Sequence, residues 1–228
     1  MKNDYFKKYF LQHDFEDNQP KKVPGPVITI ARDFGCYSSH LADMLADRLN
    51  ELSGEDQKWR WLSNEILSEA AHCLEVDPSR ISHIFGAEEK PFLHDIVESL
   101  SAKKYVCDAN IKKTIVRVIR KYAEKGNVII VGRAGCMITN DIEQALHVKF
   151  IAPFDWRVKR IQERLELSPD AARKKVIEVD ERRKTFMSFY GGDKADCELY
   201  DTIYNRAHMS ETEIVESIIS TVKLRNLL

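Results

Sequence analysis

The feature that most constrains the fold is the alternation of short apolar runs with longer amphipathic stretches. Val27–Ala31, V-I-T-I-A, is a β-branched run between Pro26 and a loop that contains Gly35, which is typical of a buried strand. From Leu41 to Leu52, leucine and methionine recur at steps of three and four residues, so a helix is expected directly after the loop. The chain therefore opens with a strand–loop–helix unit.

The same alternation continues to the end of the chain. Val128–Val131 and Val148–Ala152 have the length of central strands, and Tyr200–Tyr204 is a candidate for a fourth. From Trp59 to Ser101 we expect several short helices and no strand. Helical patterns fill the other intervals, over residues 111–124, 156–165, 169–189 and 211–224. Strands that alternate with helices predict an α/β fold, with a parallel sheet covered on both faces.

Length and charge narrow the class of protein. With 228 residues, 43% of them hydrophobic, the chain can form one core with a small inserted lobe. Residues 1–25 form a leader, set apart by prolines and a glycine, that we expect to pack on the domain or on a second copy in a homodimer. The net charge of -1 gives no overall attraction to nucleic acid or to a membrane, so any anion site must be local.

The sequence also predicts the cellular compartment and the state of the cysteines. No run approaches the roughly 18 apolar residues that cross a bilayer, and the polar start is unlike a secretory signal, so we expect a cytoplasmic protein. The five cysteines lack C-x-x-C spacing, which indicates neither a zinc site nor a disulfide framework. We expect them to be buried or half-buried small apolar residues.

The loop after the first strand is a candidate phosphate site. A helix that starts beside Ser38 and Ser39 would point unpaired N–H groups at the loop, and its dipole would favour an anion. The usual phosphate loop, G-x-x-x-x-G-K-[ST], uses its lysine on the β- and γ-phosphates, and this chain has neither that lysine nor the second glycine. By itself, the loop favours a purely structural strand–turn–helix over a phosphate site.

Four segments, in their order and spacing, resemble the cytidylate kinase-like family, a branch of the nucleoside monophosphate kinases. They are I-T-I-A-R-D-F-G at 28–35, V-I-I-V-G-R-A-G at 128–135, V-K-F-I-A-P-F-D-W-R-V-K-R at 148–160, and D-E-R-R at 180–183 with Y-D-T-I-Y-N at 200–205. The resemblance implies a P-loop kinase-type three-layer fold over 26–228, with a parallel sheet of about five strands. It also implies an inserted helical acceptor lobe at 59–105 and an arginine-bearing lid at 154–195.

The resemblance also implies roles for individual residues. The donor phosphates would lie against the loop and the start of the next helix, with Ser39 as the magnesium contact, and Arg133 would hold the phosphate of the acceptor. Ala134 stands where the family has an aspartate that reads the acceptor nucleoside, which leaves cytidine specificity open. The donor contacts would be Arg32, Gly35, Cys36, Tyr37, Ser38, Ser39 and His40, and the catalytic groups would be Arg133, Arg157, Arg160, Arg164, Asp180 and Arg183.

Each charged group also has a structural alternative. Arg32 could pair with Asp33, and Asp180 could pair with Arg183 one helical turn away. The three arginines of the lid could form a solvated face paired with nearby acidic residues. The resemblance implies an ATP- and Mg²⁺-dependent kinase for a small acceptor such as CMP or dCMP. The alternatives are a nucleotide-binding regulatory protein without turnover and a kinase for a non-nucleotide acceptor.

Overall fold

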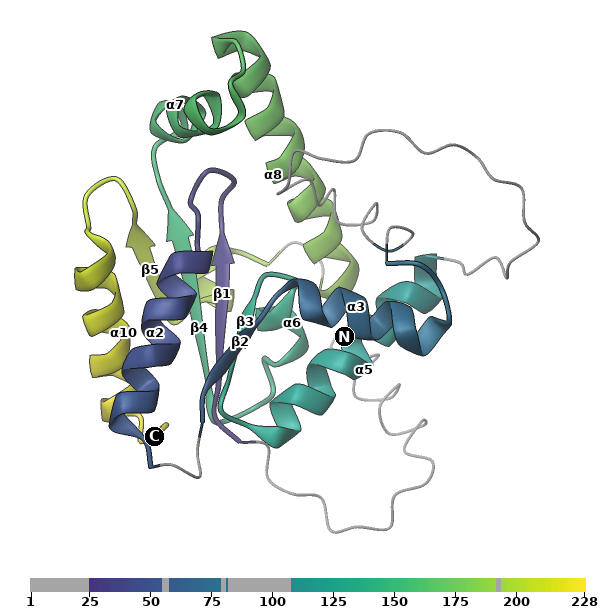
Figure 1. Ribbon diagram of the computed structural model, residues 1–228, viewed down its shortest axis with the longest axis vertical. Coiled ribbons are helices and arrows are strands. Elements are labelled where there is room, and N and C mark those ends of the chain that lie inside the picture. The colour runs from purple at the N-terminus through teal and green to yellow at the C-terminus, as the bar shows by residue number, and fades with distance from the viewer. Residues whose placement is uncertain (1–24, 55–57, 79–80, 82–107, 192–193) are drawn as a thin grey trace.

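The protein is a three-layer α/β structure built on one parallel sheet (Figure 1). The structure, a computed structural model, describes residues 25–228 except 55–57, 79–80, 82–107 and 192–193. The five strands lie in the order β2-β3-β1-β4-β5, and each pair of neighbours is parallel. The strands are β1 (Val27–Arg32), β2 (Arg60–Leu62), β3 (Val128–Val131), β4 (Ala145–Ile151) and β5 (Thr202–Asn205). This confirms the predicted fold class.

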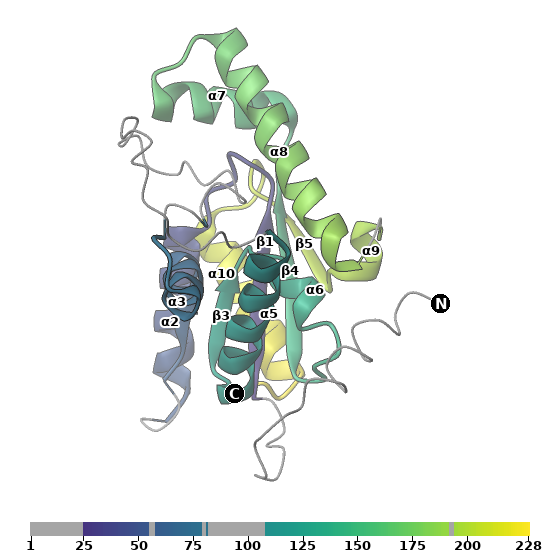
Figure 2. The ribbon, with the colours of Figure 1, turned by 90° about the vertical axis from the view of Figure 1, so that its right-hand side faces the viewer.

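Helices cover both faces of the sheet, as Figures 1 and 2 show. On one face α2 (Ser39–Leu52) packs beside α10 (Glu211–Leu224), and on the other α3 (Asn64–Leu74) packs against α5 (Asp108–Lys125). The short α6 (Gly135–Ile138) joins this second layer. Beyond the carboxyl ends of the strands, α7 (Phe154–Leu165) packs against α8 (Pro169–Gly191), and the one-turn helix α9 (Asp196–Leu199) precedes β5.

The central strand β1 is buried because both faces of the sheet are covered. Ile28 and Ile30 pack into the core beneath α2 and α10, whereas Val27 belongs to the core on the α3–α5 side. All three side chains are 0–1% exposed. A continuous apolar run rather than an alternating one is the pattern that a strand buried on both faces requires. This rigid centre fixes the position of the loop that follows Arg32.

The expectation of no strand between Trp59 and Ser101 was wrong. β2 lies at the edge of the sheet and pairs in parallel with β3, with Arg60 opposite Val128. It has only three residues, R-W-L, and only the last is buried, so it lacks the apolar run that marks the central strands. The start of the predicted lobe at Trp59 therefore lies beside a strand of the main sheet. Residues 79–80 and 82–105 of that lobe, and residues 1–24 of the leader, lie outside the described residues.

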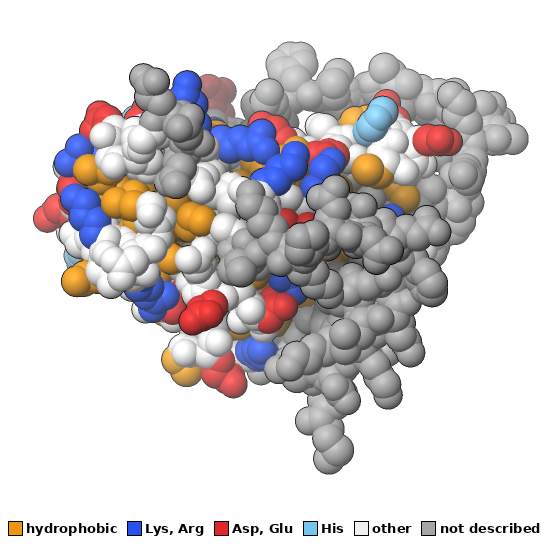
Figure 3. All heavy atoms as spheres, turned by 90° about the horizontal axis from the view of Figure 1, so that it is seen from below, with side chains coloured by type: hydrophobic (Ala, Val, Ile, Leu, Met, Phe, Trp, Pro, Cys, Tyr) orange, Lys and Arg blue, Asp and Glu red, His pale blue; other side chains and the backbone are white. Residues whose placement is uncertain are grey.

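The surface of the described residues agrees with the near-zero net charge of the sequence. No described helix combines the length and apolar character needed to cross a bilayer. Figure 3 views the end of the molecule away from α7 and shows acidic, basic and hydrophobic side chains together on that face. The strong local excess of basic groups lies elsewhere, at the carboxyl ends of the strands.

The cysteines divide into two classes. Cys36 and Cys136 are buried, as expected, but Cys73 and Cys197 are exposed, so that expectation was wrong for these two. Burial is the main cause that raises the pKa of the Cys36 thiol to about 12 and that of Cys136 to about 11. Cys107 lies outside the described residues.

We expect a thiol reagent such as DTNB to modify Cys73 and Cys197 in the native protein and to reach Cys36 and Cys136 only on unfolding. The thiolate is the reactive form, and the two buried thiols are both shielded and held protonated. Peptide mapping after brief labelling at pH 8 checks this. If Cys36 were labelled as fast as Cys73, the core around Cys36 would be open in solution.

Candidate active site

A cavity of about 860 Å³ lies at the carboxyl ends of β1 and β3, beneath α8 and beside α3 and α9. Open parallel sheets bind their ligands in this position. Basic side chains outnumber acidic ones among its lining residues, so the cavity favours an anion although the whole chain is nearly neutral. The basic lining residues are Arg32, Arg133, Lys149, Arg157, Arg182, Arg183, Lys184 and Lys194, and the acidic ones are Asp33, Asp180 and Asp196.

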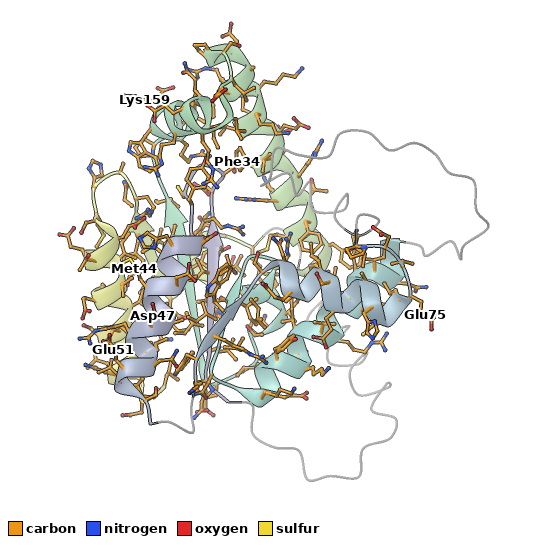
Figure 4. All side chains as sticks on the ribbon, in the orientation of Figure 1. Phe34, Met44, Asp47, Glu51, Glu75 and Lys159 are labelled. Carbon is orange, nitrogen blue, oxygen red and sulfur yellow. The ribbon has the colours of Figure 1, made fainter. Side chains whose placement is uncertain are left out.

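The loop after β1 begins with a tight turn. The Asp33 N–H donates to the Phe150 carbonyl (3.0 Å), and the Cys36 N–H donates back to the Asp33 carbonyl (3.1 Å). Gly35 has a φ of +94°, and an added Cβ would lie 3.0 Å from Cβ of Arg157. Phe34, labelled in Figure 4 below α7, packs into the small core between α7 and α8. The position of the loop therefore depends on α7 and α8, the two helices of the predicted lid.

Arg157 and Asp180 form a clamp around this loop. Nη1 of Arg157 donates to the Phe34 carbonyl (3.0 Å) and to Oδ2 of Asp180 (2.5 Å), and Nε donates to the Ala152 carbonyl (3.1 Å). Oδ1 of Asp180 accepts from the Phe34 N–H (2.8 Å). Arg157 is only 8% exposed, so the alternative of a solvated basic face is wrong for this residue. The Asp180 carboxylate pairs with Arg157, a partner that the one-turn alternative did not include.

The other two arginines of α7 lie over the loop tyrosine. Their guanidinium carbons are 5.5 Å (Arg160) and 4.0 Å (Arg164) from the centroid of the Tyr37 ring, and Arg160 is also 4.7 Å from that of Trp156. Such stacking stabilises a cation over an aromatic face. Neither arginine is among the described residues that line the cavity. Both contact Tyr37, which lies two residues before the start of α2, close to the residues predicted to hold the donor phosphates.

The start of α2 presents the predicted donor-binding residues. Ser38 is the residue before the helix and is buried, but its side chain makes no capping hydrogen bond. Ser39 and His40 are exposed, and Nε2 of His40 lies 3.5 Å from a carboxylate oxygen of Glu211. The Cys36 side chain packs inward, into the core beneath α2, and so does not obstruct the outer side of the loop. Tyr37, rather than Cys36, is therefore the bulky side chain next to the start of this helix.

Arg133 lies at the end of β3 in a left-handed backbone conformation, with a φ of +56°. Its Nη2 donates to Oδ1 of Asn64 on α3 (3.0 Å), and both residues line the cavity. Non-glycine residues with positive φ are uncommon and often mark functional sites. Ala134 follows with the same φ and is buried at the start of α6, so it offers the cavity no polar group.

Arg32 and Arg183 complete the basic side of the cavity. Nη1 of Arg183 donates to the Arg32 carbonyl (2.9 Å), which ties α8 to the end of β1. A Cβ on Gly132 would lie 2.2 Å from Nη1 of Arg32, so the absence of a side chain there lets the Arg32 guanidinium cross the end of β3. The residues predicted for acceptor binding and for the lid therefore share one cavity, except Arg160 and Arg164.

The sequence reasoning missed a charged group in the floor of the cavity. Nζ of Lys149, on β4, lies 2.6 Å from Oδ2 of Asp196 and 3.7 Å from Oδ1 of Asp33. Burial raises the pKa of the Asp33 carboxyl, although Lys149 and Arg157 both act to lower it. A lysine inside a largely apolar strand, A-L-H-V-K-F-I, was the signal that could have identified this group.

Magnesium would need few protein ligands at such a site. Within the described part of the chain, no group of three or more His, Cys, Asp or Glu residues is arranged to hold a metal. Mg²⁺ keeps several water ligands and commonly binds through one or two side chains together with substrate phosphates. The exposed Ser39 hydroxyl at the start of α2 fits this limited role.

Comparisons with known proteins agree with this architecture. The family model described as the cytidylate kinase-like family matches residues 27–208. The cytidylate kinase of Sulfolobus acidocaldarius is 26% identical over 117 residues, which are 51% of this chain and 64% of that protein. The match therefore spans less than two thirds of this relative.

Two solved structures share the fold. An uncharacterized protein from Eubacterium ventriosum superposes with a TM-score of 0.61 at 23% identity, over 87% of this chain and 98% of that one. A shikimate kinase from Bacteroides thetaiotaomicron gives a TM-score of 0.50 at 13% identity, over 89% and 99% of the two chains. Because the family model extends from β1 past the end of β5, the chain belongs to the cytidylate kinase-like family.

Proposed function

We propose that the protein is an ATP- and Mg²⁺-dependent phosphotransferase that moves the γ-phosphoryl group to a small phosphate-bearing acceptor, with CMP and dCMP the first to test. The observation that carries the proposal is the basic cavity at the carboxyl ends of β1 and β3, directly beside the loop that leads into α2. Phosphoryl transfer needs positioning and charge neutralisation more than covalent chemistry, and fixed guanidinium groups supply both.

The two substrates would meet at the loop after β1. At the start of α2, the helix N-terminus with Ser38 and Ser39 would hold donor phosphates and magnesium. Arg160 and Arg164 would leave the Tyr37 ring to contact the transferring group as the donor enters. In the cavity, Arg133 would hold the acceptor phosphate. Closure of α7 and α8 over both would exclude water and limit ATP hydrolysis.

The second candidate function is nucleotide binding without turnover. Two observations favour it: the N–H groups of Phe34 and Cys36 are already bonded within the protein, and Tyr37 lies beneath the lid arginines. A phosphate loop works by aiming such N–H groups at the ligand. A loop held in this closed form would bind nucleotide weakly or would only sense it.

One assay separates these candidates. The protein is incubated with ATP, Mg²⁺ and each of a panel of acceptors, and ADP release is followed beside the nucleotide-induced shift in melting temperature. The panel holds CMP, dCMP, UMP, AMP and small phosphorylated and hydroxylated metabolites. Acceptor-dependent ADP release supports the kinase, and a melting shift without release supports the binder. Neither response from any member would contradict both candidates.

We expect Arg133→Ala to reduce kcat/KM for the acceptor by at least about tenfold, roughly 1.4 kcal/mol of transition-state stabilisation. The change removes the guanidinium group that Asn64 holds at the cavity. Arg120→Ala on α5 is the control, since its partner Asp141 is exposed and neither residue lines the cavity. Equal kinetics of Arg133→Ala and wild type would remove Arg133 from the site.

A further inference from the structure

The loop that should neutralise the donor phosphates carries no lysine or arginine of its own. Residues 33–40 read D-F-G-C-Y-S-S-H. Phosphoryl transfer still requires a cation against the charge that spreads over the β- and γ-phosphates. Arg157 is committed to the Phe34 carbonyl and to Asp180 beneath the loop. Arg160 and Arg164 would serve the transferring group, and a further cation near the start of the loop would add to the neutralisation of the donor phosphates.

Lys149 is placed to supply it. In the sheet register Lys149 lies opposite Ala31, two residues before Asp33, so β4 carries the lysine alongside the end of β1. Its neighbours in the strand, Val148 and Phe150, pack into the core beneath α2 and α10. Because side chains alternate along a strand, Lys149 faces the opposite side, where it lines the cavity.

The ammonium group is partly desolvated and held between two carboxylates. The Lys149 side chain is 18% exposed, and such a charge is stable in the protein only with anionic partners. The contact with Asp196 is a hydrogen bond of 2.6 Å, whereas Asp33 lies at the longer distance of 3.7 Å. Both carboxylates come from outside the strand, one from the loop and one from α9. An incoming anion would have to displace these carboxylates to reach the ammonium group.

We propose that Lys149 replaces the missing phosphate-loop lysine. The proposal rests on the phosphotransferase function above. When a polyphosphate enters, the ammonium group exchanges the Asp33 and Asp196 carboxylates for phosphate oxygens. A lysine on a flexible four-carbon stem can make this exchange, whereas a guanidinium locked in three hydrogen bonds cannot. The competing interpretation is that Lys149 is a strut that ties the end of β1 to α9.

The test measures ATP affinity by calorimetry in Mg²⁺ buffer, so that it does not depend on turnover. Lys149→Met is expected to weaken ATP binding by at least about tenfold, because a charge-assisted contact to phosphate is lost. Lys149→Arg keeps the charge and should stay within about threefold of wild type. Lys121→Met is the matched control, because Lys121 makes a 2.6 Å ion pair with Glu69 on α3 and neither residue lines the cavity. This variant should bind ATP as tightly as the wild-type protein does.

Asp196→Asn separates the two interpretations. It breaks the strut but leaves the lysine, so it should tighten ATP binding by removing a competing carboxylate. Weakening of ATP binding by Asp196→Asn to the same extent as by Lys149→Met would establish the strut and overturn the proposal. Unchanged affinity in Lys149→Met would also overturn it, while leaving the phosphotransferase function intact. Wild-type protein that binds no ATP would defeat the proposed function itself, and the role of Lys149 with it.

Discussion

Replacing Arg157 with alanine is expected to lower the free energy of unfolding by about 3 kcal/mol, or roughly 6–12 °C in melting temperature. The substitution leaves the Asp180 carboxylate, 30% exposed, without its cation, and leaves the Phe34 and Ala152 carbonyls without their donor. The loss of stability is large for a single substitution because a half-buried carboxylate without a partner is unfavourable. It is at the lower end of the range for broken buried ion pairs because solvent reaches Asp180.

Arg173→Ala provides the matched comparison for this prediction. Arg173 and Asp155 also join α7 to α8, at 2.9 Å, but both side chains are more than half exposed. An exposed pair of this kind contributes at most about 1 kcal/mol. Thermal unfolding of both variants under the same conditions gives the comparison. A similar shift in the two would mean that the clamp around the loop is open in solution. We also expect Arg157→Ala to lose phosphotransfer, since Phe34 and the loop lose one of their anchors.

Gly35→Ala is expected to destabilise the protein by about 2 kcal/mol and to disturb the loop. The φ of +94° is unfavourable for any residue with a Cβ, and the added carbon would lie 3.0–3.2 Å from three atoms of Arg157. Two of those atoms are backbone, so the strain cannot be relieved by a side-chain rotation. Either Arg157 or the loop must shift, which changes the geometry on both the donor and the acceptor side.

Gly54→Ala is the control for the glycine substitution. An added Cβ there meets no atom of the described residues within 4 Å, and the φ of Gly54 lies outside the left-handed range. The same chemical change should therefore be neutral or stabilise by up to about 1 kcal/mol, through the unfolded chain alone. Chemical denaturation with a fixed m-value reports both changes. Equal stability of Gly35→Ala and wild type would contradict the close packing of the loop on α7.

Most of the sheet could be predicted because its central strands are bounded apolar runs. β1, β3 and β5 were expected within one or two residues of their observed positions, and β4 begins three residues earlier, at Ala145, because His147 interrupts its apolar run. β2 was missed because an edge strand of three residues carries no periodic signal. Local patterns identify the strands that are buried on both faces, whereas at the two edges of the sheet they indicated β5 and missed β2.

The charged groups of the site were harder to predict than the fold. Helical spacing correctly put Arg157, Arg160 and Arg164 on one helix, but spacing cannot show depth, and Arg157 alone turned out to be buried. The Asp180–Arg157 contact joins two helices and follows from tertiary packing, not from sequence separation. Lys149 was missed because strand alternation gives two faces without showing which one meets a cavity.

The most direct measurement of the central claim is the fate of the label when wild-type protein meets γ-³²P-labelled ATP, Mg²⁺ and CMP or another acceptor from the panel. If the cavity and the loop hold two phosphate-bearing substrates together, the label moves to the acceptor, and its transfer falls at least about tenfold in Arg133→Ala. Label that stays in ATP, or appears only as inorganic phosphate with every acceptor, would contradict transfer across this cavity.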